Sequence, residues 1–358
     1  MNKKLVGMLA TATLLTMALA GNVQAAEIRS VGPDGEAAVD ASTIELTDDQ
    51  IAQIKEGGYT AAICLHYGGN DWSTSQQKGL EDTFGELGIE IVAVTDANFS
   101  AETQVSNIET VMAKNPDILV SIPTDATATA DAYKQAAAAG IKIVFMDQRA
   151  DGLEAGKDYV SVVSADNYGN GYASGTVLGD ALGGKGKVAM VYYDANFAPT
   201  NQRDEGFRDA MKNYPDIEIV TEQGFTDESG CAEQGDAILT QFPNIDGIYA
   251  SWDVPMEGVL SAVRAAGMEG KVTLACNDLG NNVAREIASG NIAGGGAQMP
   301  YDQGVAEAKL AALALLGEET PSYVAVPAET VTHENVLEAY TDVYHVETPD
   351  WLKEAYVE

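Results

Sequence analysis

Apolar residues follow a regular alternation along most of the chain, beginning near Tyr59. Short runs rich in Val, Ile and Ala are apolar at nearly every position, which is typical of parallel strands covered on both faces. The longer segments between them repeat apolar residues every three or four positions, as helices packed on a sheet do. The pattern predicts strands at 61–65, 89–94, 118–122 and 141–146, with helices at 73–87, 101–113 and 126–139 between them.

The same alternation starts again after Asp158, and no segment rich in Pro or Ser separates the two halves. This arrangement predicts an α/β protein with two doubly wound parallel-sheet lobes, joined by ordered strands that cross between them. We expect the polar segment from Glu27 to Ala41 to be mobile, and we assign no structure to the tail from Thr332 onward. The second half is predicted to have strands at 159–163, 188–192, 217–220, 248–250, 272–275, 292–297 and 323–326, and helices at 168–181, 200–211, 229–242, 254–266, 279–288 and 301–316.

The first 25 residues have the features of a cleaved signal peptide. Lys3 and Lys4 precede an apolar stretch at 5–20, and small residues suit a cleavage site after Ala25. The stretch has 16 residues, three of them Thr, which is too short and too polar for a membrane span. No Cys follows it closely enough to carry a lipid anchor. We therefore expect a protein released into the periplasm, without membrane insertion.

The net charge is strongly negative, because 54 Asp and Glu outnumber 20 Lys and Arg to give −34. Such a charge repels phosphate backbones and anionic lipids, so we exclude nucleic acid as a partner. An acidic surface also keeps an exported protein soluble, which is our default interpretation of the charge. Hydrophobic residues make up 46% of the chain, which is enough to build a large core.

Three cysteines are present, which is an odd number for an oxidising compartment. Cys64 and Cys276 lie in apolar, strand-like runs, where a free Cys behaves as a small hydrophobic residue. A disulfide between Cys231 and Cys276 and a set of unpaired thiols both remain open. No CxxC motif or Cys/His ligand spacing exists, so we expect no metal.

Two glycine patterns indicate structure rather than ligand binding. Gly171, Gly175 and Gly179 recur every four residues, which predicts close packing of one helix face. The run from Gly183 to Lys187 lacks the order of a P-loop and precedes a strand instead of a helix, so it is predicted to be a turn. The GxSxG and HExxH motifs of hydrolases and metalloproteases are also absent from the sequence.

Polar and aromatic residues follow almost every predicted strand, at the place where open α/β sheets bind ligands. Asp166, Asp253 and Asp278 can instead be helix N-caps, and His66 can either line a pocket or belong to local structure. Capping does not require the aromatic residues that accompany the polar ones. The predicted ligand-binding residues are Asn70, Asp71, Trp72, Asp147, Gln148, Phe197, Arg203, Phe225, Trp252, Asp253, Asp278 and Gln298.

This mixture of side chains fits a carbohydrate. Carboxylates, amides and an arginine match sugar hydroxyls, which both donate and accept hydrogen bonds. Flat aromatic rings match the C–H faces of a sugar ring. The alternative is an exported carbohydrate-active enzyme, since paired carboxylates can serve a glycosidase. Here the carboxylates are scattered over many strand ends, so we expect a binding protein with no catalytic activity and no cofactor.

Five stretches of sequence resemble the ribose-binding-like periplasmic sugar-binding proteins of ABC transporters, which have the type I periplasmic-binding fold. The similarity runs from about Tyr59 to Val326. The order and spacing of the stretches, together with the signal peptide, make the resemblance specific. They are Ile122–Asp125 (IPTD), Ile143–Asp147 (IVFMD), Ser164–Gly169 (SADNYG), Arg203–Phe207 (RDEGF) and Ala297–Gly304 (AQMPYDQG).

The resemblance implies a monomeric solute-binding protein that carries a monosaccharide or sugar alcohol in an interlobe cleft to an inner-membrane ABC permease. It implies an extension at 26–57, a first lobe of 58–165 plus 299–326, and a second lobe of 166–298 plus 327–358. Hinge crossings are implied near Ala165, Gln298 and Pro327. The family's ligand positions fall on Asn70, Trp72, Asp147, Arg203, Phe225, Trp252 or Asp253, Asp278 and Gln298.

The sequence departs from the ribose-binding pattern at several of these positions. Ile122 stands where the pattern has Asn, and Gln148 stands where it has Arg. Trp72 is followed by Ser73 instead of a second aromatic residue, and Trp252 replaces a strand-end Asn. These changes remove polar contacts and reshape the stacking wall, so ribose as the ligand does not carry over.

Overall fold

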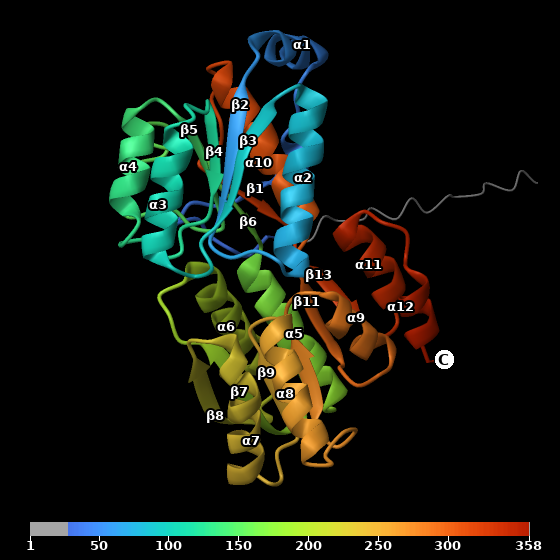
Figure 1. The fold of residues 1–358 in the computed structure, drawn as a ribbon. Helices are drawn as coiled ribbons and strands as arrows, with labels where there is room; N and C mark the ends of the chain where they lie inside the picture. The colour runs from blue at the N-terminus through green and yellow to red at the C-terminus, as the bar shows by residue number, and fades with distance from the viewer. Residues whose placement is uncertain (1–27, 358) are drawn as a thin grey trace, which may run out of the picture.

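The computed structural model describes residues 28–357, and the predicted signal peptide lies outside the described residues. Two separate sheets form the molecule (Figure 1). The first has the order β1-β12-β6-β5-β4-β2-β3, and all its strand pairs are parallel. Its strands are β1 (Val39–Asp40), β2 (Thr60–Leu65), β3 (Glu90–Asp96), β4 (Ile118–Ser121), β5 (Lys142–Met146), β6 (Ser161–Ala165) and β12 (Tyr323–Val326).

The second sheet has the order β13-β11-β10-β9-β7-β8. Its strands are parallel except for the antiparallel pair of β11 and β13. The continuous apolar runs are explained by burial on both faces, since β9 and β10 are buried over nearly their whole length. The strands are β7 (Lys185–Tyr193), β8 (Asp216–Phe225), β9 (Gly247–Ala250), β10 (Thr273–Cys276), β11 (Gly294–Ala297) and β13 (Glu329–Thr332).

Helices cover both faces of each sheet, and each face has its own hydrophobic cluster. The first sheet, with its helices, makes the first lobe, and the second makes the second lobe. The helices of the first lobe are α1 (Asp48–Gly57), α2 (Asp71–Leu87), α3 (Ala101–Met112), α4 (Ala130–Ala138) and α10 (Pro300–Leu315). Those of the second are α5 (Asn167–Ala181), α6 (Ala198–Met211), α7 (Cys231–Gln241), α8 (Asp253–Ala265), α9 (Asn281–Ala288), α11 (Val336–Tyr344) and α12 (Asp350–Ala355).

The chain passes between the lobes three times. It leaves the first lobe at the end of β6 to enter α5, and it returns from β11 to α10. After β12 it crosses once more, since β13 pairs with β11 in the second sheet. The predicted α/β fold, with two parallel-sheet lobes joined by several ordered crossings, is confirmed.

Two helix pairs pack closely through glycine. A Cβ on Gly171 in α5 would lie 1.8 Å from the carbonyl oxygen of Arg203 in α6, and one on Gly79 in α2 would lie 2.2 Å from that of Tyr301 in α10. Only glycine permits such an approach of two helix backbones. The close packing predicted from the glycine spacing in α5 is therefore present, and it brings the start of α6 to the lobe interface.

The segment before α1 was predicted to be mobile, but from residue 28 onward it is held in place by hydrogen bonds. Its backbone is fixed at the first crossing, where the N–H groups of Arg29 and Ser30 donate to the Asp166 carboxylate at 2.9 and 2.8 Å. Further along, β1 adds a parallel strand beside β12. Backbone hydrogen bonds do not depend on apolar side chains, so the polar composition of this segment concealed its structure.

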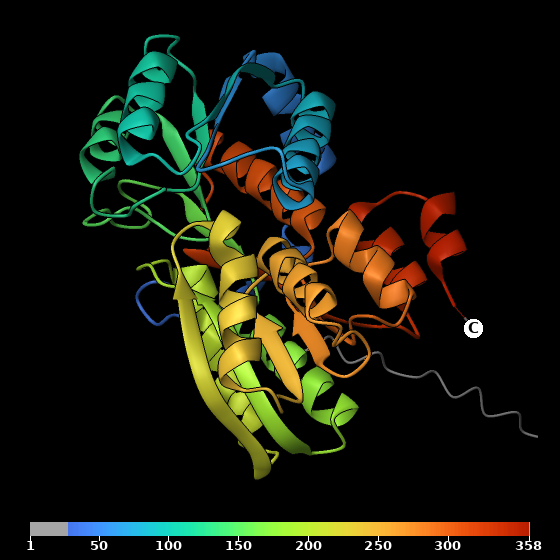
Figure 2. The same ribbon diagram turned by 60° about the horizontal axis from the view of Figure 1, so that its bottom comes forward.

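The C-terminal tail, to which the sequence assigned no structure, forms β13, α11 and α12. Figures 1 and 2 both show α11 and α12 beside α9 on the second lobe. Val336, Ala339 and Val343 of α11 belong to the same hydrophobic cluster as Val283 and Ile287 of α9. The tail therefore completes the core of the second lobe.

Candidate functional site

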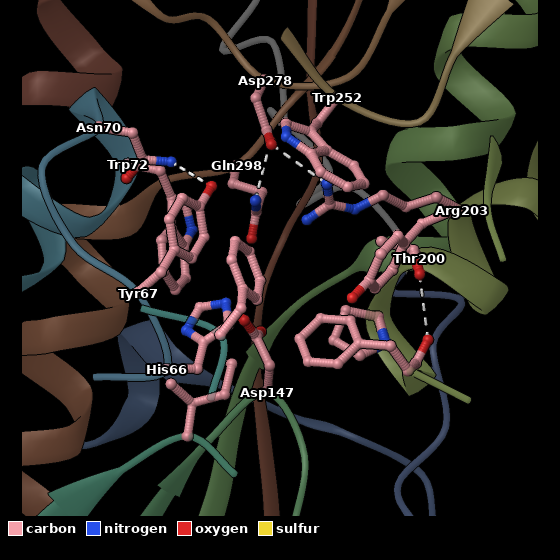
Figure 3. A pocket seen from close by; sticks show the side chains of 15 residues that line it. His66, Tyr67, Asn70, Trp72, Asp147, Thr200, Arg203, Trp252, Asp278 and Gln298 are labelled. Carbon is pink, nitrogen blue, oxygen red and sulfur yellow. Dashed lines mark hydrogen bonds and ion pairs between the residues drawn. The ribbon is translucent and has the colours of Figure 1, made fainter. Parts of the chain in front are cut away.

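A cavity lies between the two lobes, at the carboxyl ends of strands from both sheets (Figure 3). The space among its lining residues that protein atoms do not occupy is about 460 Å³, and part of it is open to solvent. The first lobe contributes His66, Tyr67, Asn70, Trp72, Phe99, Ile122 and Asp147. The second contributes Tyr193, Phe197, Pro199, Thr200, Arg203, Trp252, Asp278 and, at the second crossing, Gln298.

Arg203, near the middle of α6, is the cation of this cavity and is only 5% exposed. Its Nη1 donates to Asp278 Oδ2 at 3.1 Å, and its Nε donates to Asn167 Oδ1 at 2.8 Å. Gln298 Nε2 donates to the other Asp278 oxygen at 2.8 Å (Figure 3). Burial opposes the charge of Arg203, but the carboxylates of Asp278 and Asp147 outweigh it and raise the pKa of Arg203. The guanidinium is thus held in a fixed orientation beside the cavity.

The two carboxylates of the cavity occupy sharp turns. Asp147 directly follows β5 with φ 54°, and Asp278 closely follows β10 with φ 69°. Both values lie in the left-handed region, which Asp tolerates better than most residues. The backbone N–H of Asp147 is bonded to Val163 O at 2.7 Å, and that of Asp278 to Gly296 O at 2.8 Å. Neighbouring strands therefore hold both turns in place.

Asp147 is nearly buried, and neutral side chains donate hydrogen bonds to its carboxylate. Ser164 Oγ donates to its Oδ1 at 2.9 Å, and Gln303 Nε2 donates to the same oxygen at 3.3 Å. Burial raises the pKa of Asp147, and the positive charge of Arg203 opposes this rise. The carboxylate lines the cavity on the first-lobe side, opposite Arg203 on the second.

A second buried acid, Asp204, lies next to Arg203 on α6 but does not line the cavity. Ser251 Oγ donates to its Oδ1 at 2.6 Å, and Tyr249 Oη donates to it at 3.4 Å. Burial raises the pKa of Asp204 to about 7, against the lowering effect of the Ser251 hydrogen bond. These hydrogen bonds tie α6 to β9 and the residue after it, and the Asp204 carboxyl carries a proton at mildly acidic pH.

Aromatic rings form much of the remaining wall and meet across the lobes. His66 of the first lobe stacks on Phe197 of the second, with centroids 5.7 Å apart and an interplanar angle of 16°. Burial lowers the pKa of His66 to about 3, so its imidazole is neutral at physiological pH. Trp252 packs edge-on to Tyr193 at 5.6 Å. The two lobes are therefore already in contact through rings that line the cavity.

The loop after β2 positions the first-lobe groups. Asn70 caps α2 by accepting a hydrogen bond from the Ser73 N–H at 2.9 Å, and its Nδ2 donates to Tyr67 Oη at 2.5 Å. A preference of Asn for the N-cap explains why α2 begins here. Tyr67 in turn stacks on Phe99 at 4.2 Å. Asn70 therefore has a structural role as well as a place on the cavity wall.

Most of the predicted ligand-binding residues meet at this cavity: Asn70, Trp72, Asp147, Phe197, Arg203, Trp252, Asp278 and Gln298. The other four do not line it. Asp71 accepts hydrogen bonds from Asn281 across the lobes, at 2.7 and 2.8 Å. Gln148 Nε2 donates to Pro123 O at 2.8 Å, and Gln148 Oε1 accepts from the Ala198 N–H at 3.2 Å.

The last two of these four lie behind the wall. Phe225 packs against Trp252, with ring centroids 5.1 Å apart. Asp253 begins α8 and accepts from the N–H groups of Val254 and Gly280, at 2.8 and 3.0 Å. The N-cap alternative is wrong for Asp253 and Asp278, because the N-caps of α8 and α9 are Trp252 and Gly280. It is confirmed for Asp166, which caps α5 by accepting from the Gly169 N–H at 2.9 Å. Burial raises the pKa of Asp253 well above its ordinary value, and the nearby Asp278 charge adds to this rise.

Several lining residues were not among those predicted. His66 is one of them. Of the two alternatives given for it, the one in which it lines a pocket agrees with the structure. Tyr67 and Tyr193 closely follow or end strands, so their position after apolar runs was an available signal. Phe99 also follows a strand, β3, and a turn with positive φ brings it to the cavity. The others are Ile122, Pro199 and Thr200.

None of the three cysteines lines the cavity. Cys64, Cys231 and Cys276 are all buried and unpaired. Burial raises the pKa of the Cys64 thiol to about 11 and that of Cys231 to about 12. Within residues 28–357, no three His, Cys, Asp or Glu side chains come together in a metal-binding group. Over the same range, no helix has both the length and the apolar character that a bilayer-spanning segment requires.

Comparison with known proteins agrees with this architecture. The family model described as periplasmic binding protein domain matches residues 61–319. The ribose import binding protein RbsB of Salmonella typhimurium is 24% identical over 272 residues, covering 76% of this chain and 90% of the relative. The D-ribose/D-allose-binding protein of Pseudomonas aeruginosa is 29% identical over 273 residues, covering 73% and 83%.

Solved structures show the same similarity. An ABC transporter periplasmic solute-binding protein from Actinobacillus succinogenes with bound D-allose has a TM-score of 0.72 and 28% identity, covering 78% of this chain and 99% of the other. A solute-binding protein from Agrobacterium vitis bound with α-D-tagatopyranose has a TM-score of 0.74 and 25% identity, covering 82% and 100%. The resemblance found in the sequence is confirmed, and the chain belongs to the periplasmic binding protein family.

Proposed function

We propose that this protein binds a monosaccharide or sugar alcohol in the interlobe cleft and delivers it, as a monomer, to an inner-membrane ABC permease. The observation that carries the proposal is the composition of the cavity. A fixed guanidinium, Arg203, and two carboxylates, Asp147 and Asp278, share it with stacked aromatic rings. Charge-assisted hydrogen bonds to the hydroxyls and stacking of aromatic rings on the C–H faces are the two contacts that bind a polyhydroxylated ring.

Unpartnered polar atoms in the wall support a hydroxylated ligand. Trp72 Nε1, Gln298 Oε1 and His66 Nδ1 are buried and have no hydrogen-bond partner among residues 28–357. Each belongs to a residue that lines the cavity. A buried polar atom without a partner costs about 1–3 kcal/mol, so ligand hydroxyls that pair with these atoms recover that free energy on binding.

For delivery, a permease must distinguish the ligand-bound protein from the empty one by its conformation. The cavity walls belong to both lobes, so a ligand that contacts both favours the closed arrangement over the open one. Bonds between the lobes, such as those from Asn281 to Asp71, form only when the lobes meet. Rotation at the three crossings would bring the facing edges together, and the closed pair of edges is what a permease would recognise.

The relatives support the ligand class. They are named for ribose and allose, and neighbouring structures hold D-allose and tagatose. All of these are monosaccharides. The replacement of polar positions by Ile122 and Trp252 keeps the choice among monosaccharides and sugar alcohols open to experiment.

A thermal-shift screen of pentoses, hexoses, furanosides and polyols tests the proposal, because a ligand that binds only the folded state raises Tm. We expect at least one compound to raise Tm and to be recovered chemically unchanged. Replacing Arg203 with Ala should then weaken its binding by about 5- to 150-fold. Asp147→Asn provides a second variant if Arg203→Ala does not fold. A panel without any shift, or turnover of the bound sugar as by a carbohydrate-active enzyme, would contradict the proposal.

A further inference from the structure

A second cavity adjoins the first at the mouth of the cleft. Protein atoms leave about 720 Å³ of space unoccupied here, part of it open to solvent, and several of the lining residues are exposed. Four aromatic residues, Tyr67, Phe99, Tyr193 and Trp252, line both cavities. The remaining residues of the second cavity are polar: Asn98, Thr226, Asp227 and Glu228. The cleft therefore continues outward past an aromatic boundary into a polar chamber.

The two sides of this chamber come from different lobes. Asn98 and Phe99 follow β3 in the first lobe, whereas Thr226, Asp227 and Glu228 follow β8 in the second. A molecule in the chamber would therefore contact both lobes, as a molecule in the first cavity would. Binding there adds to the preference for the closed state, because only closure brings the two loops together.

Phe99 provides a flat, accessible ring in the chamber. It is 39% exposed, and it stacks on Tyr67 with an interplanar angle of 21°. Asn98 and Phe99 have consecutive φ values of 47° and 58°, which are unfavourable for residues with a Cβ. The turn is held by hydrogen bonds from the Phe99 N–H to His66 O at 2.8 Å and from the Asn98 N–H to Asp96 Oδ1 at 2.7 Å. The backbone thus presents an aromatic ring to the cleft.

Acceptors dominate the polar side of the chamber. Glu228 Oε1 accepts from Trp252 Nε1 at 2.8 Å, and burial raises the pKa of Glu228. Asp227 uses Oδ1 to accept from the N–H and Oγ of Ser229, at 2.9 and 2.7 Å. Two carboxylates disfavour a phosphate or carboxylate substituent by charge repulsion. Hydroxyl groups, which donate to carboxylates, suit this wall.

We propose that this chamber is a second sugar subsite, so that the cleft, besides the monosaccharide of the proposed function, takes a neutral sugar carrying a second ring in glycosidic linkage and binds it more tightly. The first ring occupies the first cavity, and the second ring lies against Phe99 with its hydroxyls donating to Asp227 and Glu228. The inference rests on the proposed function, because it requires that the first cavity binds a sugar. It goes further by assigning the chamber and the size of the ligand.

Isothermal titration of matched sugars tests the subsite. The probes are the monosaccharide that raises Tm most, disaccharides that contain the same ring, and its phosphate ester. We expect at least one disaccharide to bind about tenfold or more tightly than the monosaccharide, and the phosphate ester to bind more weakly than it. This expectation follows from the added stacking and the carboxylate wall.

Two variants locate the effect. Asp227→Ala removes an exposed carboxylate, and Asn98→Gly removes a side chain while keeping the left-handed backbone favourable. Neither residue lines the first cavity. Each variant should lose at least fivefold in disaccharide affinity and bind the monosaccharide within twofold of wild type. Asp350→Ala, an exposed aspartate in α12, serves as the matched control and should change neither affinity.

The possible outcomes separate this inference from the proposed function. Monosaccharide binding with equal or weaker binding of every disaccharide would overturn the second subsite and leave the first intact. A tighter disaccharide whose affinity is unchanged in both variants would place its second ring elsewhere and would also overturn the subsite. The absence of binding by every carbohydrate would instead refute the proposed function.

Discussion

The buried carboxyl of Asp204, next to Arg203 in α6, should make the stability of the protein depend on pH. Asp204 is 3% exposed, and burial raises its pKa to about 7, whereas an Asp in an unfolded chain has a pKa of about 3.9. Between these two values the folded protein holds a proton that the unfolded chain has released. The free energy of unfolding therefore falls as pH rises through this window, and the loss is complete above the folded pKa.

The magnitude follows from the shift. One pKa unit corresponds to about 1.4 kcal/mol, so the part of the window between about pH 5 and pH 7 contributes roughly 3 kcal/mol. In Asp204→Asn the neutral amide cannot ionise, and its oxygen can still accept the Ser251 Oγ hydrogen bond. The variant should therefore lack this contribution to the pH dependence.

Urea unfolding of both proteins at about pH 5 and pH 8.5 measures the effect. We expect wild type to lose roughly 3 kcal/mol more than Asp204→Asn between the two conditions. The comparison cancels the contribution of the many other acidic groups, provided that both proteins unfold in two states. Asp236→Asn, at an exposed position in α7, is the control and should follow wild type.

The reasoning is refuted by one clear result. If wild type and Asp204→Asn lose the same free energy between the two pH values, Asp204 is ionised in the folded protein throughout. Its burial would then be compensated by the positive charges of Arg203 and Arg208, which lower its pKa.

Two further predictions concern the helix packing and the lobe contacts. Gly171→Ala should lower the free energy of unfolding by about 1–3 kcal/mol in urea titrations, because its Cβ would meet the Arg203 carbonyl oxygen at 1.8 Å. Asp71→Ala should increase the radius of gyration of the ligand-free protein in small-angle X-ray scattering, because it removes both hydrogen bonds from Asn281 across the cleft.

Each of these predictions has a matched control. Gly85→Ala, in α2, places its Cβ in open space and should stabilise the protein by up to about 1 kcal/mol. A destabilisation equal to that of Gly171→Ala would show that the close approach is not the cause. Asp131→Ala changes an aspartate in the first turn of α4 that pairs with Lys134. A scattering change equal to that of Asp71→Ala would rule out the contact between the lobes as its origin.

The central strands could be predicted because burial on both faces leaves continuous apolar runs, as in β4 and β9. The edge strand β8 was predicted only at 217–220 and extends to Phe225, because its exposed residues include Glu222. The helix predicted from residue 126 begins at Ala130. Asp125 Oδ1 accepts from the N–H groups of Thr127 and Ala128 and so holds the chain in a turn.

The tail was not assigned because β13 is an edge strand of four residues with only Val331 buried, so no continuous apolar run marks it. Its partner β11 was predicted within 292–297, although it consists of Gly294, Gly295, Gly296 and Ala297. The glycines are required by space, since a Cβ on Gly295 would lie 1.7 Å from the Cys276 carbonyl oxygen. Such close contacts appear only when the sheet is assembled.

The candidate site was predicted in part because topology brings the strand ends together. Sequence position alone does not show whether a polar side chain remains available at the cavity. Gln148 follows Asp147 directly, yet its amide bridges Pro123 O and the Ala198 N–H. Asp71 is adjacent to Trp72 but is bonded to Asn281. These partners lie far away in sequence, so only the folded arrangement reveals them.

The three crossings also affect the order in which the chain can fold during synthesis. In the first sheet, β12 lies between β1 and β6, so a nascent chain that has not reached Tyr323 has an open gap beside β6. In the second, β13 covers the edge of β11 and is made later still. Pairings between such distant segments slow folding, because the entropy of closing long loops is lost first. Both lobes are therefore completed together, and a chain truncated before β12 leaves unpaired strand edges in each sheet that favour aggregation.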